Sequence, residues 1–165
     1  MDRDQATGDD RTSRASFGLR ALCGACLVSS ILAHAQVAST DPIIGVWRTY
    51  DDRTGKPQGQ IRIAQVAGQY VGSIERGEEG DDPNARCSAC RDSRHNMPLM
   101  GMVLLEGLQR QPDGSYANGR ILDPDTGNTW QCDIHVNPDG KSLVIHGFIG
   151  LRMFGRSQTW RREGD

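Results

Sequence analysis

The feature that most constrains the fold of this chain is a recurring turn. Clusters of Gly, Pro, Asp and Asn interrupt the sequence at short intervals, and short runs of alternating apolar and polar residues lie between them. The alternation is clearest at 128–136, where Trp130, Cys132, Ile134 and Val136 fall on one side of an extended chain. Alternating runs separated by hairpin-length turns are typical of a β-sandwich or barrel.

Eight such runs make up most of the chain after the first forty residues. They span residues 43–50, 58–66, 70–76, 100–110, 115–122, 128–136, 141–149 and 156–162. Eight strands in up-and-down order can close on themselves, and closure removes the exposed edges of an open sheet. A length of 165 residues suits one domain, and 20 glycines suit many turns. The sequence therefore predicts an all-β fold, an eight-stranded antiparallel up-and-down barrel.

The overall charge and hydropathy exclude two classes of partner. Nineteen Lys and Arg against 21 Asp and Glu give a formal net charge of −2, so that no global basic field would attract nucleic acid. No apolar run reaches the roughly 18 to 20 residues that a membrane-spanning helix needs. We therefore expect neither a nucleic-acid partner nor a transmembrane segment.

The first 35 residues have the features of an export signal. Basic residues precede an apolar stretch at 21–32, and Ala33-His34-Ala35 is a small-x-small cleavage sequence. We expect a signal peptide at 1–35, cleavage between Ala35 and Gln36, and a mature barrel domain at 36–165 that is periplasmic or secreted. The alternative is a buried N-terminal helix.

The two ends of the predicted barrel domain carry a possible closing pair. Gly45-Val46-Trp47 begins the first run, and Trp160-Arg161-Arg162 ends the last. A G-x-W on the first strand, with an Arg of the last strand packed across the Trp, resembles the barrel-closing signature of lipocalins and their calycin relatives. The indole would plug one end and a guanidinium would lie over its face. We assign Gly45, Trp47, Arg161 and Arg162 to closure, and which Arg makes the contact stays open.

A longer set of motifs covers nearly the whole chain after residue 36. It comprises Gly45-x-Trp47, Gly55-Lys56, Asp82-Pro83-Asn84-x-x-Cys87-x-x-Cys90, Pro98-x-x-Gly101-Met102, Ile121-Leu122-Asp123-Pro124, Gly127, His146-Gly147-Phe148-Ile149-Gly150 and Gly155-Arg156-Ser157-Gln158-Thr159-Trp160. Together these resemble DUF2147, a family of exported bacterial proteins of unknown function. The resemblance implies export and a lipocalin-like barrel, and it implies no reaction. The chain departs from the family motif at His146, where the family has a basic residue.

Three cysteines follow the predicted cleavage site, and two of them lie in a long irregular segment at 77–99. In an exported protein one disulfide is expected among Cys87, Cys90 and Cys132, with one thiol left over. A bond from Cys87 or Cys90 to Cys132, which would pin the segment to the barrel, is favoured over a local Cys87–Cys90 bond. Two further readings are a redox Cys-x-x-Cys motif and a zinc site with His95.

No constellation of catalytic residues stands out. The chain contains neither a G-x-S-x-G nor an H-E-x-x-H motif, and its paired acidic residues lie in turns and loops. The run from Asp123 to Gly127 has the composition that a β-turn demands. We therefore expect no enzyme, no cofactor and no metal site. His146 is expected to be a satisfied residue of the barrel wall. The arginines Arg152, Arg156, Arg161 and Arg162 could bind an anion at one barrel end, although a solvated rim is the commoner arrangement.

The predicted function is the binding of a small apolar molecule inside the barrel. An eight-stranded barrel is just wide enough to hold one small ligand or to be filled by its own side chains. The inward-facing residues expected to contact a ligand are Ile61, Ile63, Trp130, Ile134, Leu143 and Ile145. The alternative is a structural or protein-interaction module of the cell envelope that uses the 77–99 loop as its contact surface.

Overall fold

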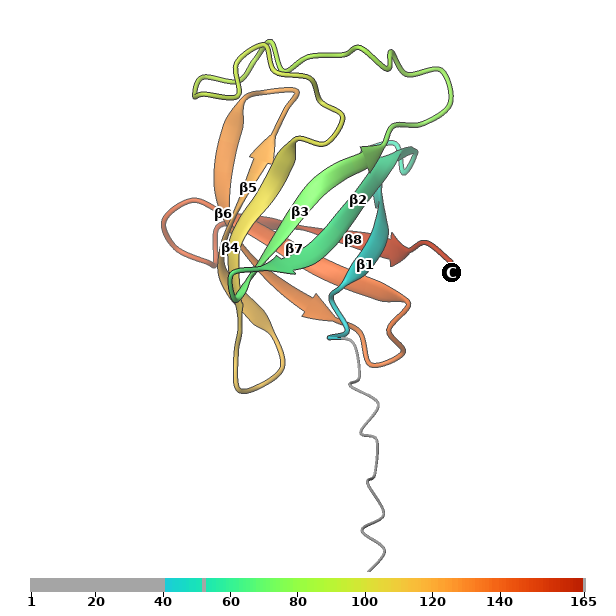
Figure 1. Cartoon of the computed structure of the whole chain (residues 1–165). Coiled ribbons are helices and arrows are strands. Elements are labelled where there is room, and N and C mark those ends of the chain that lie inside the picture. Colours follow the sequence, from blue (N-terminus) through green and yellow to red (C-terminus); the bar gives the residue numbers. More distant parts are fainter. Residues whose placement is uncertain (1–40, 52, 165) are drawn as a thin grey trace, which may run out of the picture. The chain divides into compact units, whose positions relative to one another are not determined.

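The computed structural model describes residues 41–51 and 53–164, which form eight β-strands. The strands are β1 (Gly45–Tyr50), β2 (Pro57–Val66), β3 (Gln69–Arg76), β4 (Val103–Arg110), β5 (Tyr116–Asp123), β6 (Asn128–Val136), β7 (Ser142–Phe148) and β8 (Gly155–Arg162). Each strand pairs antiparallel with the next, and β8 pairs with β1, so that the sheet closes (Figure 1). The predicted eight-stranded barrel is confirmed. The predicted signal peptide, with its cleavage site between Ala35 and Gln36, lies outside the described residues.

Strand register determines which side chains face the interior. In the β6–β7 pair, Cys132 lies opposite Gly147 and Ile134 lies opposite Ile145. Ile134 and Ile145 are buried, whereas His135, the next residue along β6, is exposed. This alternation is the period of two that the sequence predicted for this strand.

Large apolar side chains fill the interior. They come from all eight strands and include Trp47, Ile61, Ile63, Tyr70, Leu105, Leu108, Tyr116, Cys132, Ile134, Leu143, Ile145 and Trp160. Burial of a Leu, Ile or Phe side chain contributes roughly 1.5 to 3 kcal/mol. The interior therefore accounts for much of the stability of the barrel. Among the described residues, no helix is long and apolar enough to cross a membrane.

The up-and-down order gives the barrel two different ends. The β1–β2, β3–β4, β5–β6 and β7–β8 connections lie at one end, which we call the mouth. The β2–β3, β4–β5 and β6–β7 turns lie at the other end, together with residues 41–44, which lead into β1. We call this second end the closed end.

The long segment 77–102 between β3 and β4 runs across the mouth end of the barrel, where Ala89 lies against Gly127 of the β5–β6 turn (Figure 1). Leu104 and Leu105 are consecutive residues of β4, and both are buried. Because consecutive side chains of a strand face opposite sides, one of the two must be covered from outside. Leu104 belongs to one apolar cluster with Cys87 and Cys90 of this segment. The segment therefore shields apolar side chains that face away from the barrel interior.

Two strands begin later than the sequence predicted. The strand expected from Met100 begins at Val103, because the chain turns there and the N–H of Met102 donates to the carbonyl of Leu99 (2.9 Å). The strand expected from Ile43 begins at Gly45, because the N–H of Ile44 donates to the carbonyl of Asp41 (2.9 Å). Apolar residues in tight turns extended the predicted runs beyond the paired strands.

Candidate functional site

A tryptophan–arginine pair seals the closed end. Trp47 is fully buried, and its indole N–H donates to the carbonyl of Ile43 (2.8 Å). The guanidinium carbon of Arg162 lies 4.2 Å from the centroid of the Trp47 ring system, within cation–π range. Arg162 also donates to the carbonyls of Gly140 (2.7 Å) and Ile44 (2.9 Å). One side chain therefore joins the start of β1, the β6–β7 turn and the end of β8.

Arg162, and not Arg161, makes the predicted contact with Trp47. Arg161 faces the other side of β8, where its guanidinium lies 5.8 Å from the ring centroid of Tyr50. The role of Gly45 also becomes clear. A Cβ at this position would lie 2.3 Å from Nη1 of Arg162, and its φ of +144° is a backbone conformation that other residues rarely adopt. Gly45 therefore leaves the space through which Arg162 reaches the main chain.

A carboxylate at the closed end, which sequence reasoning missed, holds the segment that leads into β1. The hydroxyl of Tyr70 donates to Oδ2 of Asp41 (2.7 Å), and the hydroxyl of Tyr116 donates to Oδ1. Arg110 adds an ion pair at 3.5 Å. The two tyrosine rings pack edge to face with centroids 5.1 Å apart. No periodicity marks an isolated Asp before a strand, so only the buried tyrosines at two strand starts could have hinted at a shared acceptor.

The environment of Asp41 lowers its pKa. Burial by itself would raise the pKa of this carboxyl, but hydrogen bonds from Tyr116, Tyr70 and the backbone N–H of Ile43 favour the charged form and outweigh burial. Burial and the neighbouring carboxylate raise the pKa of Tyr70 to about 12. The carboxylate is thus held charged among neutral hydroxyls that all donate to it. This arrangement secures the closed end.

Five of the six residues expected to contact a ligand lie in the packed core. Ile61, Ile63, Ile134, Leu143 and Ile145 are each at most 5% exposed and belong to the same apolar cluster as Trp47. They pack against one another and against the closing pair. The structure therefore assigns these five residues to the filling of the barrel, and it separates them from the sixth, Trp130.

Partly buried apolar side chains line the inner wall beside the mouth. Trp130 lies opposite Ile121 in the β5–β6 pair, and Ile74 lies opposite the buried Ile61 in the β2–β3 pair. The register places all three on the interior face, but Trp130, Ile121 and Ile74 are only partly buried. Ile121 and Ile74 pack on the core from the mouth side. We call Ile74, Ile121 and Trp130 the inner rim. It is the candidate site.

Polar groups lie beside the inner rim on β1 and β8. Gln158 lies opposite Ile145 and accepts a hydrogen bond from the indole N–H of Trp160 (3.2 Å). Arg156 lies opposite Gly147, nearer the mouth, and is exposed. Thr49 of β1 donates to the carbonyl of Gly59 (3.3 Å). The mouth therefore combines an apolar surface with a few polar groups, a combination that suits recognition of a small molecule.

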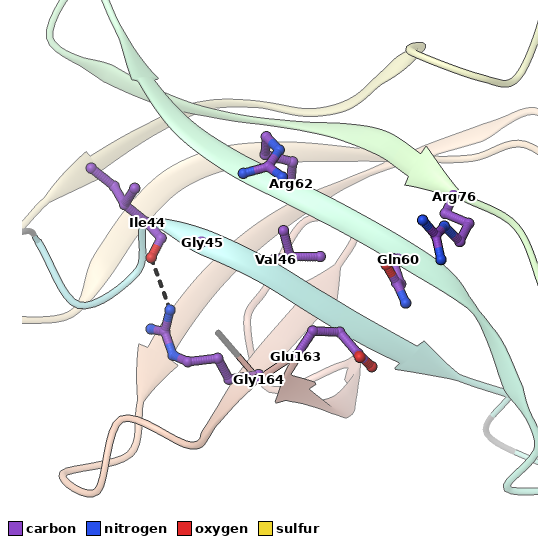
Figure 2. Close-up of a pocket in the computed structure, with 9 residues that line it drawn as sticks. Ile44, Gly45, Val46, Gln60, Arg62, Arg76, Glu163 and Gly164 are labelled. Carbon is purple, nitrogen blue, oxygen red and sulfur yellow. Dashed lines mark hydrogen bonds between the residues drawn. The ribbon is translucent and has the colours of Figure 1, made fainter.

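Two clefts of the described residues lie on the outer surface. The larger, of about 580 Å³, runs beside β1 and β2 at the C-terminal residues (Figure 2). Figure 2 shows Arg62, Arg76, Gln60 and Glu163 around its walls. Arg62 is already paired with Glu75 (2.6 Å). The second cleft, of about 370 Å³, contains Arg94 and Arg120, which pair with Asp92 and Glu106. Both clefts are polar, and most of their cations are matched by carboxylates.

The four arginines considered as an anion site are not brought together. β8 runs from the mouth to the closed end, and Arg156 and Arg162 are six residues apart on it, or about 20 Å at a strand rise of roughly 3.3 Å per residue. Arg152 pairs with Asp133 (2.7 Å) on the outer face. His146 is hydrogen-bonded to Ser157 Oγ (2.9 Å) and to the carbonyl of Arg152 (2.7 Å). It is thus a satisfied residue of the barrel wall.

The cysteines pair locally. Cys87 and Cys90 form the disulfide, with Cα atoms 5.4 Å apart, and Cys132 is a buried free thiol on β6. The favoured bond to Cys132 is therefore wrong. Cys132 faces the barrel interior beside Leu108, whereas Cys87 belongs to segment 77–102 and its Sγ lies 3.5 Å from the carbonyl oxygen of Pro124 in the β5–β6 turn. Burial raises the pKa of Cys132 to about 12. His95 does not join the pair as a ligand, because its Nδ1 is hydrogen-bonded to the carbonyl of Cys90 (2.9 Å).

Comparison with known proteins identifies the barrel and the family. A solved structure described as "Protein HP1028 from the human pathogen Helicobacter pylori belongs to the lipocalin family" matches with a TM-score of 0.68 at 19% identity, over 76% of this chain and 86% of that chain. At this identity the likeness shows the fold alone. No curated protein matches. The family model "Uncharacterized protein conserved in bacteria (DUF2147)" matches residues 45–162, from the glycine before Trp47 to the arginine that covers it. With this match spanning every strand of its lipocalin-like barrel, the chain belongs to the DUF2147 family.

Proposed function

We propose that this chain is an exported, non-enzymatic binding protein that holds a small, largely apolar molecule at the mouth of its barrel. The apolar stretch and cleavage sequence before Gln36 support export. The lipocalin-like barrel supports binding, because barrels of this size hold one small ligand or none. The packed core leaves the inner rim as the part of the interior face that is still accessible.

The observation that carries the proposal is the partial exposure of Trp130 on the interior face. Trp47 and Trp160 are buried, so Trp130 differs from the other two tryptophans of the chain. An indole offers a large flat apolar surface on which a ring or an acyl chain can stack at little entropic cost. Ile74 and Ile121 extend that surface, and Gln158 and Arg156 supply polar groups beside it. The ligand would cover the inner rim without entering the core.

The test is native mass spectrometry of the protein purified gently from its host. We expect a bound small molecule on the wild-type protein and its loss from Trp130→Ala. The matched control is Thr129→Ala, which alters the exposed neighbour of Trp130 on the outer face of the same strand. Absence of any adduct on the wild-type protein, or an adduct that survives Trp130→Ala with Ile121→Ser, would overturn the proposal.

Export is tested separately by cell fractionation and N-terminal sequencing. We expect the protein in the periplasm or medium, with Gln36 as its first residue. A full-length chain recovered from the cytoplasm would contradict export and would leave the binding test intact.

The alternative, a protein-interaction module that uses residues 77–99, is favoured by one observation. Met97 and Met100, in and just beyond this loop, are 48% and 44% exposed. Methionine is common on surfaces that adapt to a partner. Crosslinking in the cell with Met97→Ser and Met100→Ser would test it, since these changes keep the Cys87–Cys90 bond. Loss of a captured partner would favour this alternative, and unchanged capture would exclude it.

A further inference from the structure

The β7–β8 connection exposes more apolar surface than any other connection among the described residues. It spans residues 149–154, with the sequence Ile-Gly-Leu-Arg-Met-Phe. Its four large apolar side chains are all exposed: Ile149 63%, Leu151 64%, Met153 78% and Phe154 70%. A contiguous apolar patch of this kind marks a surface that meets something other than water.

Polar contacts hold the backbone of this loop in place. The N–H of Phe154 donates to the carbonyl of Leu151 (3.0 Å), which forms a turn at the tip. The imidazole of His146 contacts the carbonyl of Arg152 (2.7 Å), and the Arg152 guanidinium reaches back to Asp133 (2.7 Å). The loop is therefore anchored on its polar side, and its apolar side chains extend away from these contacts.

The outer wall beneath the loop is already occupied. Phe148 is buried, its ring stacks on His146 with centroids 5.8 Å apart, and the Arg152 guanidinium lies 5.7 Å from its ring centroid. Phe148 is therefore packed between His146 and Arg152. The four exposed side chains of the loop take no part in this packing.

One unpaired cation of the described residues lies beside the loop, because Lys141, Arg161 and Arg162 of the flanking segments lie at the closed end. Residues 141–162 contain five Lys and Arg and no Asp or Glu. Arg162 is used at the closed end and Arg152 is paired with Asp133, but Arg156 is exposed and has no carboxylate partner in residues 41–51 and 53–164. An apolar tip beside an unpaired arginine complements a surface that is anionic outside and apolar beneath.

We propose that the β7–β8 loop docks the protein on an anionic phospholipid surface. The four apolar side chains would enter the boundary between headgroups and acyl chains, which segments bound at the interface penetrate by roughly 5 to 10 Å. Arg156 would meet lipid phosphates, and each cation near such a surface favours binding. A second copy of the chain is a poorer occupant, because one six-residue tip falls well short of the roughly 800 Å² per partner of a stable interface. The docking surface shares Arg156 with the proposed ligand site, but its four apolar side chains do not belong to the inner rim.

Vesicle co-sedimentation tests the proposal with the protein as isolated from its host. Vesicles contain phosphatidylcholine alone or phosphatidylcholine with one third phosphatidylglycerol. We expect at least fivefold stronger partitioning to the anionic vesicles. Leu151→Ser with Phe154→Ser should lower that partitioning at least tenfold, and Arg156→Gln should lower it a few-fold on anionic vesicles only. Val66→Ser, at the exposed β2–β3 turn of the closed end, is the matched control and should change nothing.

Three results would overturn the proposal. The first is equal partitioning to both kinds of vesicle, or none. The second is full binding by the Leu151→Ser, Phe154→Ser variant once circular dichroism shows it to be folded. The third is a concentration-dependent dimer that the same two changes abolish, because that result would assign the loop to self-association.

Discussion

Each end of the barrel has a tryptophan on its interior face, but the chain covers only the one at the closed end. At the closed end Trp47 is fully buried, its N–H is hydrogen-bonded, and Arg162 covers its face. At the mouth Trp130 lies on the same interior face but is only partly buried. The closed end is thus completed by the chain itself, and the mouth leaves apolar surface uncovered.

This difference separates stability from function along the barrel axis. Hydrogen bonds of Asp41, Trp47 and Arg162 hold the segment that leads into β1, and the Trp47 side chain is fully buried. The inner rim contributes less packing, because each of its side chains keeps contact with water. Substitutions at the closed end should therefore reduce stability, and substitutions at the mouth should reduce binding.

The largest expected effect is that of Trp47→Ala. Removal of a buried indole loses its burial and leaves a cavity, which costs about 3 to 5 kcal/mol. This is a large part of the roughly 5 to 15 kcal/mol that stabilises a typical domain. Urea unfolding of wild type and variant measures the loss. A loss below about 1 kcal/mol would mean that Trp47 does not close the barrel.

Arg162→Ala should have the next largest effect, a loss of about 2 to 3 kcal/mol. The change removes a cation–π contact and leaves the carbonyls of Gly140 and Ile44 without their donor. Arg161→Ala, the matched control one residue earlier, should cost less than about 1 kcal/mol, because Arg161 is exposed. A double-mutant cycle with Trp47→Ala should be non-additive for Arg162 and additive for Arg161. The reverse pattern would contradict the assignment of Arg162.

Asp41→Asn should cost about 1 to 2 kcal/mol at neutral pH, since a charged acceptor of several hydrogen bonds is replaced by a neutral one. The pKa of Asp41 is lowered below its ordinary value of 3.8 in the folded chain. The Asp41 carboxylate therefore stabilises the folded chain above pH 4, and this stabilisation is lost as the pH falls through the lowered pKa. Unfolding followed from pH 7 to pH 2 should show the gap between wild type and Asp41→Asn narrowing in acid. A gap that stays constant would contradict this role.

The sequence predicted the strands because they carry a periodic signal. Eight alternating runs and the turns between them were sufficient to predict the barrel, and the pairing of Trp47 with an arginine followed from the ends of the first and last strands. The sequence could not show which arginine contacts Trp47, because Arg161 and Arg162 are adjacent and carry the same charge. Only the backbone shows which of them passes beside Gly45.

Other features have no periodic signal and could not be predicted. Leu104 faces away from the barrel interior, so an alternating pattern predicts that it is exposed to water. It is nevertheless buried, because segment 77–102 covers it. The choice of partner for Cys87 depends on which face of the barrel the segment covers. The exposure of Trp130 depends on its depth along the barrel, and alternation gives only the face. For the same reason, the sequence grouped Trp130 with Ile134 and Ile145, which lie deeper.

The smallest expected effect on stability is that of Trp130→Ala, and it is the sharpest test of the difference between the two ends. A half-buried indole loses only part of its burial and leaves no closed cavity, so the free energy of unfolding should fall by about 1 kcal/mol. Urea unfolding compares this loss directly with that of Trp47→Ala. The same variant should lose the ligand adduct that Trp47→Phe, a conservative change at the closed end, retains. If Trp130→Ala instead destabilises the chain as much as Trp47→Ala does, the inner rim belongs to the core. The mouth would then be a second closed end, with no accessible apolar surface on which a ligand could rest.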